Sequence, residues 1–235
     1  MVTGMSQPVS LDDAVPPGVA VPDHRFGLGL LAVVIFGAGA LFAQNNHVPS
    51  WDQLLTTRLA HPRGSSAFRL ADAVSTLASG PVIAALAVGF AIATWRRSRN
   101  LLMAALVPVA GALGGVAELA AKHVVGRLRP PTAVLTGESG NGFPSGHTTG
   151  ATAVAFAIVA MLAALGFSGR RLAIAWCVAI VASVMVAVAR VVVGAHYLLD
   201  TIGGLALGSL CALVAAVVLS AAPASHLVEH WRHRS

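Results

Sequence analysis

The chain has 235 residues, of which 56% are apolar and only 10% are charged, whereas soluble domains carry about 25% charged residues. So few charges cannot cover a surface in water, which excludes an ordinary soluble domain, a coiled coil and a disordered protein. The net charge of +6 comes from 15 basic and 9 acidic residues scattered among apolar runs, too few for a nucleic-acid-binding stripe. We therefore expect a membrane protein with no nucleic-acid partner.

The two ends of the chain differ from its apolar middle. Residues 1–25 hold four of the twelve prolines and show no apolar periodicity, which predicts a mobile cytoplasmic tail. This tail lacks the basic leader of a secretory signal, so the apolar run that follows is expected to be a retained first span. Residues 226–235 form a second, basic cytoplasmic tail, which leaves residues 26–225 as a single membrane domain.

Six uncharged runs within this domain are each about 20 residues long, the length that crosses a bilayer as a helix. They cover residues 26–43, 73–95, 101–117, 148–169, 172–189 and 201–225. The predicted fold class is therefore all-α, an integral membrane bundle of six transmembrane helices. Paired glycines at 114/115 and 203/204 would let neighbouring helices approach closely.

The loop between the first two runs, residues 44–72, predicts a short helix of its own. Ser50 would be its N-cap, and Trp51, Leu54, Leu55 and Leu59 would form its apolar face. We expect that face to lie on the membrane surface.

Arginines near the span ends indicate the orientation. One side would hold eight arginines and the other only Arg58, Arg63 and Arg69, once the basic residues of the motifs described below are set aside. By the positive-inside rule, both termini are cytoplasmic and the loops after the first, third and fifth spans lie outside. The expected location is the plasma membrane, with several passes.

Three short motifs lie at the outer ends of the third, fourth and fifth predicted spans. They read Lys122-x6-Arg129-Pro130, Pro144-Ser145-Gly146-His147 and Arg190-x5-His196-x3-Asp200. The three cations lack an equal number of nearby acids, which suits an anion with several oxygens, such as phosphate. Because the second motif opens a helix, its free backbone N–H groups would point toward the same anion.

The third motif also offers a nucleophile. If residues 195–200 are helical, His196 and Asp200 lie one turn apart, so the carboxylate can hold one imidazole nitrogen while the other attacks phosphorus. Arg190 and His196 would lie on different sides of an unbroken helix, and Gly194 is the expected break.

These three motifs, in this order, resemble those of the type 2 phosphatidic acid phosphatase family, which are K-x6-RP, PSGH and SR-x5-H-x3-D. The resemblance covers residues 122–200, and the six-span layout extends it over most of the chain. One position departs from the family pattern, because Ala189 stands where the family has a serine before the arginine.

The resemblance implies a role for each motif residue. His196 would form a phosphohistidine intermediate, Asp200 would orient it, and His147 would protonate the leaving group and later activate water. The phosphoryl oxygens would be held by a set of cations and helix-end groups, namely Lys122, Arg129, Ser145, Gly146 and Arg190. It implies no metal or cofactor, and only Glu118, Glu138 and Asp200 lie near the motifs, too few carboxylates for a two-metal site.

The leading hypothesis is thus a lipid phosphatase, a metal-independent phosphoric monoester hydrolase or diphosphatase, with residues 26–225 as its six-span phosphatase domain. Its partners would be membrane lipids and a lipid phosphate: phosphatidic acid, phosphatidylglycerophosphate or polyprenyl diphosphate. Two alternatives stay open, a vanadium-dependent haloperoxidase-like enzyme and a non-catalytic lipid binder or transporter. The choice of lipid and the oligomeric state are not determined by the sequence.

Four residues around the motifs carry separate expectations. Glu118 stands one helical turn before Lys122, in the order that favours an ion pair. Glu138 lies between Gly137 and Gly140, which indicates a solvated acid in a flexible loop. Arg127 is expected to meet lipid headgroups, with substrate contact as the alternative, and Tyr197 to be an interfacial anchor.

Overall fold

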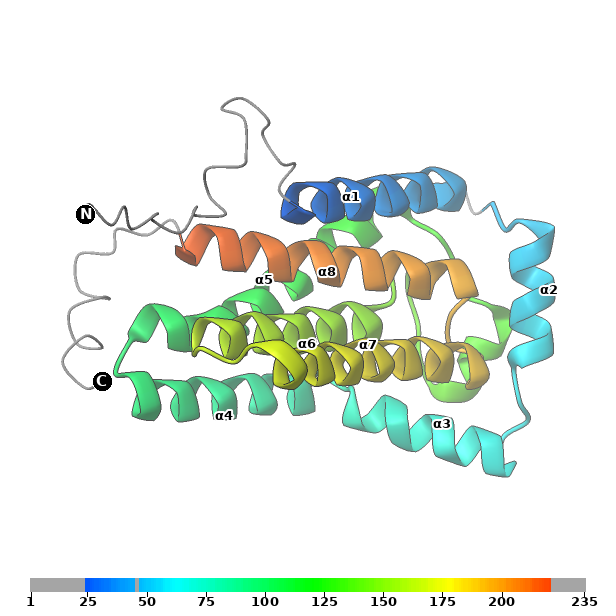
Figure 1. The fold of residues 1–235 in the computed structure, drawn as a ribbon. Helices are drawn as coiled ribbons and strands as arrows, with labels where there is room; N and C mark the ends of the chain where they lie inside the picture. The colour runs from blue at the N-terminus through cyan, green and yellow to red at the C-terminus, as the bar shows by residue number, and fades with distance from the viewer. Residues whose placement is uncertain (1–23, 45–46, 221–235) are drawn as a thin grey trace, which may run out of the picture.

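The computed structural model describes residues 24–44 and 47–220, and within them all regular structure is helical (Figure 1). The elements in chain order are α1 (His24–Ala43), α2 (Ser50–Leu59), α3 (Ser66–Leu77), α4 (Gly80–Ser98), α5 (Leu101–Val125), the 3-10 helix η3 (Pro131–Thr136), α6 (Gly146–Ala164), α7 (Gly169–Val192) and α8 (Leu198–Ser220). The predicted all-α class is confirmed. Residues 1–23 and 226–235, which hold nearly all of the predicted tails, lie outside the described residues.

Four helices, α5 to α8, are each long and apolar enough to cross a membrane. Helices α3 and α4 meet that test only as a pair bent by 47°, and α1 contributes a shorter apolar stretch, Gly27–Ala43. The second predicted run is divided because Gly80 and Pro81 start a new helix after Ser79. The described residues therefore contain four spans, or five if the bent pair is one span, and the expected six are not confirmed.

Helix α6 lies at the centre of the bundle and packs against α5, α7 and α8, while α1 covers the other side of α8. The core between α5, α6 and α8 is built from Leu106, Val107, Val154, Met161 and Ala215. Many apolar side chains of α1, α4 and α7 instead point outward, with Leu41 at 72% and Val178 at 63% exposure. Such exposed apolar surface is stable in lipid, and the chain is a multi-pass membrane protein.

Glycines of α8 allow it to approach α6 closely. A Cβ on Gly204 would lie 2.9 Å from the Ser145 carbonyl oxygen, and one on Gly208 would lie 2.6 Å from that of Thr149. No room exists for a side chain at either position. The close approach expected at Gly204 is confirmed, whereas a Cβ on Gly115 would meet nothing within 4 Å.

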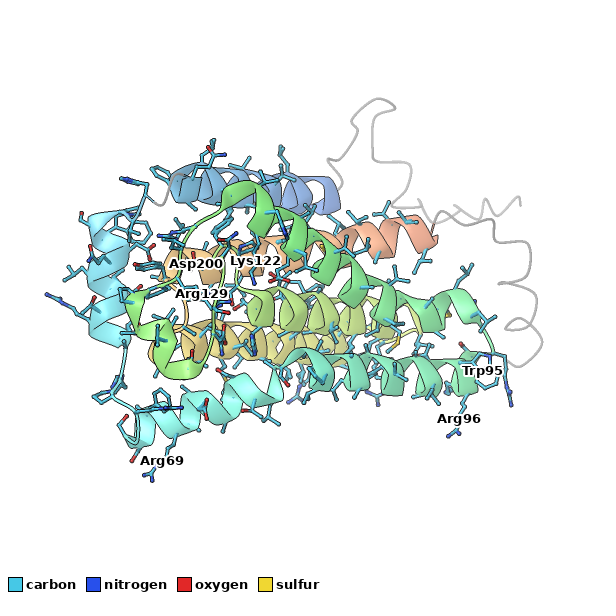
Figure 2. All side chains as sticks on the ribbon, turned by 180° about the vertical axis from the view of Figure 1, so that it is seen from behind. Arg69, Trp95, Arg96, Lys122, Arg129 and Asp200 are labelled. Atoms are coloured by element: carbon cyan, nitrogen blue, oxygen red, sulfur yellow. The ribbon has the colours of Figure 1, made fainter. Side chains whose placement is uncertain are left out.

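All three motifs lie at one end of the bundle. Helices α5 and α7 end there, α6 and α8 begin there, and α2 lies across that end (Figure 1). Figure 2 shows Lys122, Arg129 and Asp200 together at this end, whereas Trp95 and Arg96 lie at the opposite end. The sequence expectation that the motifs share one end of the bundle is confirmed.

Helix α2 has an apolar outer side and a polar inner side. Trp51 and Leu54 are 46% and 50% exposed, whereas Asp52 and Thr56 are buried. The Leu199 N–H donates to Asp52 Oδ1 at 3.1 Å and the Leu198 N–H to Thr56 Oγ1 at 3.1 Å, so α2 satisfies the first free donors of α8. The predicted cap is wrong: Ser50 is already the first helical residue, and Pro49 precedes it.

Candidate active site

The backbone turn at Gly194 brings the third motif together. Gly194 adopts a φ of +75°, a left-handed conformation that glycine tolerates best, and the Ala195 N–H donates to the Arg190 carbonyl at 3.1 Å. The predicted break is confirmed. Since α8 begins only at Leu198, the condition that residues 195–200 are all helical is not met, and His196 lies in the bend before α8.

His196 and Asp200 are both completely buried. Asp200 lies in the first turn of α8, where its Oδ2 accepts the Tyr197 N–H at 3.0 Å, a capping contact that orients the carboxylate. His196 Nδ1 lies 3.4 Å from the same Oδ2, longer than a charge-assisted hydrogen bond. The predicted pair is therefore in place, with its two polar atoms close but not in tight contact.

The other imidazole nitrogen faces the cations. Arg129 Nη1 lies 2.8 Å from His196 Nε2, and because a guanidinium can only donate, Nε2 is the unprotonated nitrogen and Nδ1 carries the proton. Burial first, and then the positive charges of Arg129 and Arg190, lower the pKa of His196 well below 6.5. The ring is therefore neutral at physiological pH, with the Nε2 lone pair directed at the cation cluster.

Glu138 lies among the same cations, which corrects the expectation of a solvated loop acid. Its Oε2 is 2.6 Å from Arg129 Nη1 and 3.9 Å from His196 Nε2, and its Oε1 pairs with Arg190. The loop of Glu138 is attached to the end of α5 by Asn141, whose side-chain amide donates to the Lys122 carbonyl at 2.8 Å. One carboxylate thus pairs with two of the three predicted phosphate-binding cations and offsets one of their two positive charges.

Lys122 forms the expected ion pair with Glu118, one turn earlier on α5. Glu118 also lies against the start of α6, since a Cβ on Gly146 would come within 2.7 Å of its Oε1. The positive end of α6, which the sequence assigns to a phosphate, therefore faces a carboxylate of the chain itself. Lys122 still lies near enough to His196 to contribute to the positive field on it.

Of the second motif, His147 lies near the cations, whereas the Ser145 hydroxyl does not contact them. Ser145, the residue before α6, is fully buried; its Oγ accepts from Thr148 Oγ1 at 3.1 Å and its N–H donates to the Asp200 carbonyl at 2.9 Å. His147 is half-buried and lies within electrostatic range of Arg129 and Lys122. The structure thus brings His147 to the site, while the Ser145 hydroxyl is engaged in the first turn of α6.

Arg127 lies inside the protein beside Asp200, not at the lipid headgroups. It is fully buried, donates to Asp200 Oδ1 at 2.7 Å and to Asp52 Oδ2 at 2.8 Å, and its guanidinium lies 4.6 Å from the centre of the Tyr197 ring. Neither the lipid-headgroup role of Arg127 nor the interfacial role of Tyr197, which is only 9% exposed, is correct. Arg127 and Arg129 are two apart in an extended segment, a spacing that directs both side chains to one side.

Fold and site together define a multi-pass helical membrane protein with two histidines and a cluster of basic residues at one end of its bundle. The chain belongs to the PAP2 superfamily, whose family model matches residues 100–223. The resemblance seen in the three motifs is thereby confirmed.

A similar sequence and a similar crystal structure both come from Bacillus subtilis. Phosphatidylglycerophosphatase B of strain 168 is 35% identical over 91 residues, which is 38% of this chain and 44% of that protein. The match thus spans less than half of the relative. The crystal structure of a transmembrane PAP2-type phosphatidylglycerolphosphate phosphatase superposes with a TM-score of 0.70 at 23% identity, covering 83% of this chain and 95% of that one. At this identity the likeness shows a shared fold.

Proposed function

We propose that this protein is a lipid phosphatase that hydrolyses a phosphomonoester or diphosphate of a membrane lipid through a phosphohistidine at His196. The observation that carries the proposal is the position of the buried His196 ring, whose Nε2 lies 2.8 Å from Arg129 Nη1 in a cluster of cations. The names of the Bacillus subtilis relative and of the similar crystal structure support a phospholipid phosphate as substrate. Phosphatidic acid, phosphatidylglycerophosphate and polyprenyl diphosphate are the candidates.

In the first step, His196 Nε2 attacks phosphorus while the bond from phosphorus to the lipid oxygen breaks. Lys122, Arg129 and Arg190 hold the phosphoryl oxygens. To reach Arg129 and Arg190, the phosphate replaces the Glu138 carboxylate that occupies both in the free protein. Positive charge develops on the ring, and Asp200, 3.4 Å from Nδ1, stabilises it as the contact shortens in the substrate complex.

His147 handles the protons in both steps. It first gives a proton to the lipid oxygen as that oxygen leaves, and it is then neutral. In the second step it takes a proton from water, whose oxygen attacks phosphorus and breaks the bond to His196 Nε2. Phosphate is released, and both histidines return to their starting states.

The proposed mechanism uses no metal. Four acidic side chains around the site already have a basic partner: Asp52 and Asp200 pair with Arg127, Glu118 with Lys122, and Glu138 with Arg129 and Arg190. A two-metal phosphatase instead needs several carboxylates that converge on the ions. This donor set suits an anion better than a divalent cation.

The direct test is phosphate release by the purified full chain in detergent micelles, with each of the three lipid phosphates as substrate and a chelator present. We expect turnover of at least one lipid, and its loss in His196→Ala. No phosphate release from any of them would contradict the proposal and leave the lipid binder or transporter. Halide oxidation by vanadate-loaded protein would favour the haloperoxidase-like alternative.

A further inference from the structure

A buried ion-pair chain connects the catalytic carboxylate to α2, a helix that none of the three motifs includes. We propose that Asp52 and Arg127 are positioning residues that fix the Asp200 carboxylate against His196, so that one residue of α2, Asp52, supports the catalytic pair. The inference rests on the proposed phosphatase chemistry, but it does not depend on which lipid is the substrate.

The three residues of the ion-pair chain, Asp52, Arg127 and Asp200, contact one another through defined atoms. Arg127 uses its two terminal nitrogens on two different carboxylates, at 2.7 Å to Asp200 Oδ1 and 2.8 Å to Asp52 Oδ2, and all three side chains are completely buried. Buried charges of this kind are stable only with partners and well-formed hydrogen bonds. Losing Arg127 would leave both carboxylates without this basic partner, and losing either carboxylate would leave one terminal nitrogen of Arg127 without its acceptor.

Each carboxylate is also tied to the start of α8. Asp52 Oδ1 accepts the Leu199 N–H at 3.1 Å, and Asp200 Oδ2 accepts the Tyr197 N–H at 3.0 Å. The Tyr197 ring packs on the Arg127 guanidinium, which further limits its rotation. These contacts form a closed ring that fixes the rotation of the Asp200 carboxylate and hence the direction of Oδ2 toward His196.

The net charge of Asp52, Arg127 and Asp200 favours the proposed reaction. Two carboxylates and one guanidinium leave one net negative charge next to the His196 ring. That ring becomes positive when Nε2 bonds to phosphorus, so the excess charge stabilises the intermediate and the transition state that leads to it. Without the charge of Asp52 the trio is neutral, and this stabilisation is lost.

The test compares Asp52→Asn with Thr56→Val in the full chain. Asparagine keeps the shape and an acceptor for the Leu199 N–H but removes the charge. Thr56 is the matched control, because it also lies on the buried side of α2 and accepts an N–H from the start of α8 at 3.1 Å, without contact to Arg127. The substrates are p-nitrophenyl phosphate, which is not a lipid, and dioctanoyl phosphatidic acid.

For Asp52→Asn we expect kcat to fall about 10- to 100-fold, the loss that follows removal of one charge-assisted hydrogen bond. KM and the inhibition constant of inorganic phosphate should stay within about twofold, because Lys122, Arg129 and Arg190 are unchanged. Thr56→Val should keep kcat within about twofold even if the variant melts earlier. An unchanged kcat in folded Asp52→Asn, or an equal kcat loss in both variants, would overturn the inference.

A second measurement, NMR of the histidine rings, needs no substrate and reports on His196 directly. In protein labelled with nitrogen-15 histidine, the NMR signals of the His196 ring should move in resting Asp52→Asn and not in Thr56→Val. Unmoved signals in Asp52→Asn would overturn the inference.

A second variant serves if Asp52→Asn does not fold. Asp52→Glu keeps the charge but displaces it, so we expect a reduced kcat with unchanged phosphate inhibition. A wild-type kcat would overturn the inference. Hydrolysis of p-nitrophenyl phosphate without any lipid phosphate would refute only the lipid assignment.

Discussion

At the scale of single residues, the ionisation of His196 determines when the site is active. Burial and neighbouring cations lower the pKa of this ring well below 6.5, so Nε2 stays unprotonated as the pH falls through 6.5. We predict that kcat/KM for p-nitrophenyl phosphate, whose leaving group needs no proton from His147, is retained at pH 6.5 and declines only at lower pH. A midpoint at or above 6.5 would contradict the assignment.

The same shift affects stability. Below a pH of about 6.5 the unfolded chain binds a proton on this histidine while the folded chain does not. The contribution of His196 to the free energy of unfolding is thus constant above that pH and falls as the pH decreases toward the lowered folded-state pKa.

Glu138 provides a second prediction at this scale. The carboxylate occupies Arg129 and Arg190 in the free protein, so Glu138→Gln should make inorganic phosphate a better inhibitor. A partly exposed ion pair is worth up to about 1 kcal/mol, or roughly fivefold in the inhibition constant. Ser139→Ala, at an exposed position in the same loop, is the control. Weaker phosphate inhibition in Glu138→Gln would instead show that the carboxylate helps to hold the substrate.

The structure also explains the one departure from the family motif. Ala189 is 4% exposed and packs in an apolar cluster with Phe68 and Ala71 of α3, and with Val193 and Ala195. A serine hydroxyl at this position would be buried among apolar side chains. The alanine therefore fits the packing of α3 against α7.

At the scale of elements, the close packing of α8 on α6 sets the position of Asp200. Gly208→Ala would place a Cβ 2.6 Å from the Thr149 carbonyl oxygen, so the helices must separate. We predict a loss of about 1–3 kcal/mol, the usual cost of overpacking, measured as a lower unfolding temperature in detergent. Gly115→Ala on α5, where a Cβ meets nothing within 4 Å, should be neutral or stabilising. Equal effects of the two changes would contradict the packing argument.

The sequence was most informative where helices alternate in direction. The ends of α5 and α7 and the starts of α6 and α8 must share one side of a membrane, so motifs far apart in sequence were correctly assigned to one end of the bundle. The alternation says nothing about loops. It therefore does not predict that the loop of Glu138 lies on Arg129 and Arg190.

The sequence pattern of α2 does not identify Asp52 as a site residue. In water, an amphipathic helix buries its apolar side, but next to a membrane the apolar side of α2 faces outward, and Asp52 and Thr56 face the protein. The apolar pattern of Trp51 and Leu54 correctly indicated a surface helix. That pattern does not predict that the polar side is buried, and no spacing rule connects Asp52 to Arg127, 75 residues later.

At the scale of the whole molecule, the positive-inside rule leads us to propose that the site lies on the outer face of the plasma membrane and both termini in the cytoplasm. We predict that a cysteine at Ser139, near the site, reacts with a membrane-impermeant maleimide on intact cells. A cysteine at Ser168, between α6 and α7, should react only after lysis. Both tests need Cys177 and Cys211 replaced first, and the reverse labelling pattern would invert the proposed orientation.

The central claim is that His196 carries the phosphoryl group during turnover. Its most direct measurement is alkaline quenching of the protein within its first turnover of phosphorus-32-labelled lipid phosphate, because phosphohistidine survives base and is lost in acid. We predict a base-stable, acid-labile label that maps to His196 and is absent from His196→Ala. Phosphate release by the wild-type protein with no label on His196, or an equal label in His196→Ala, would contradict the account.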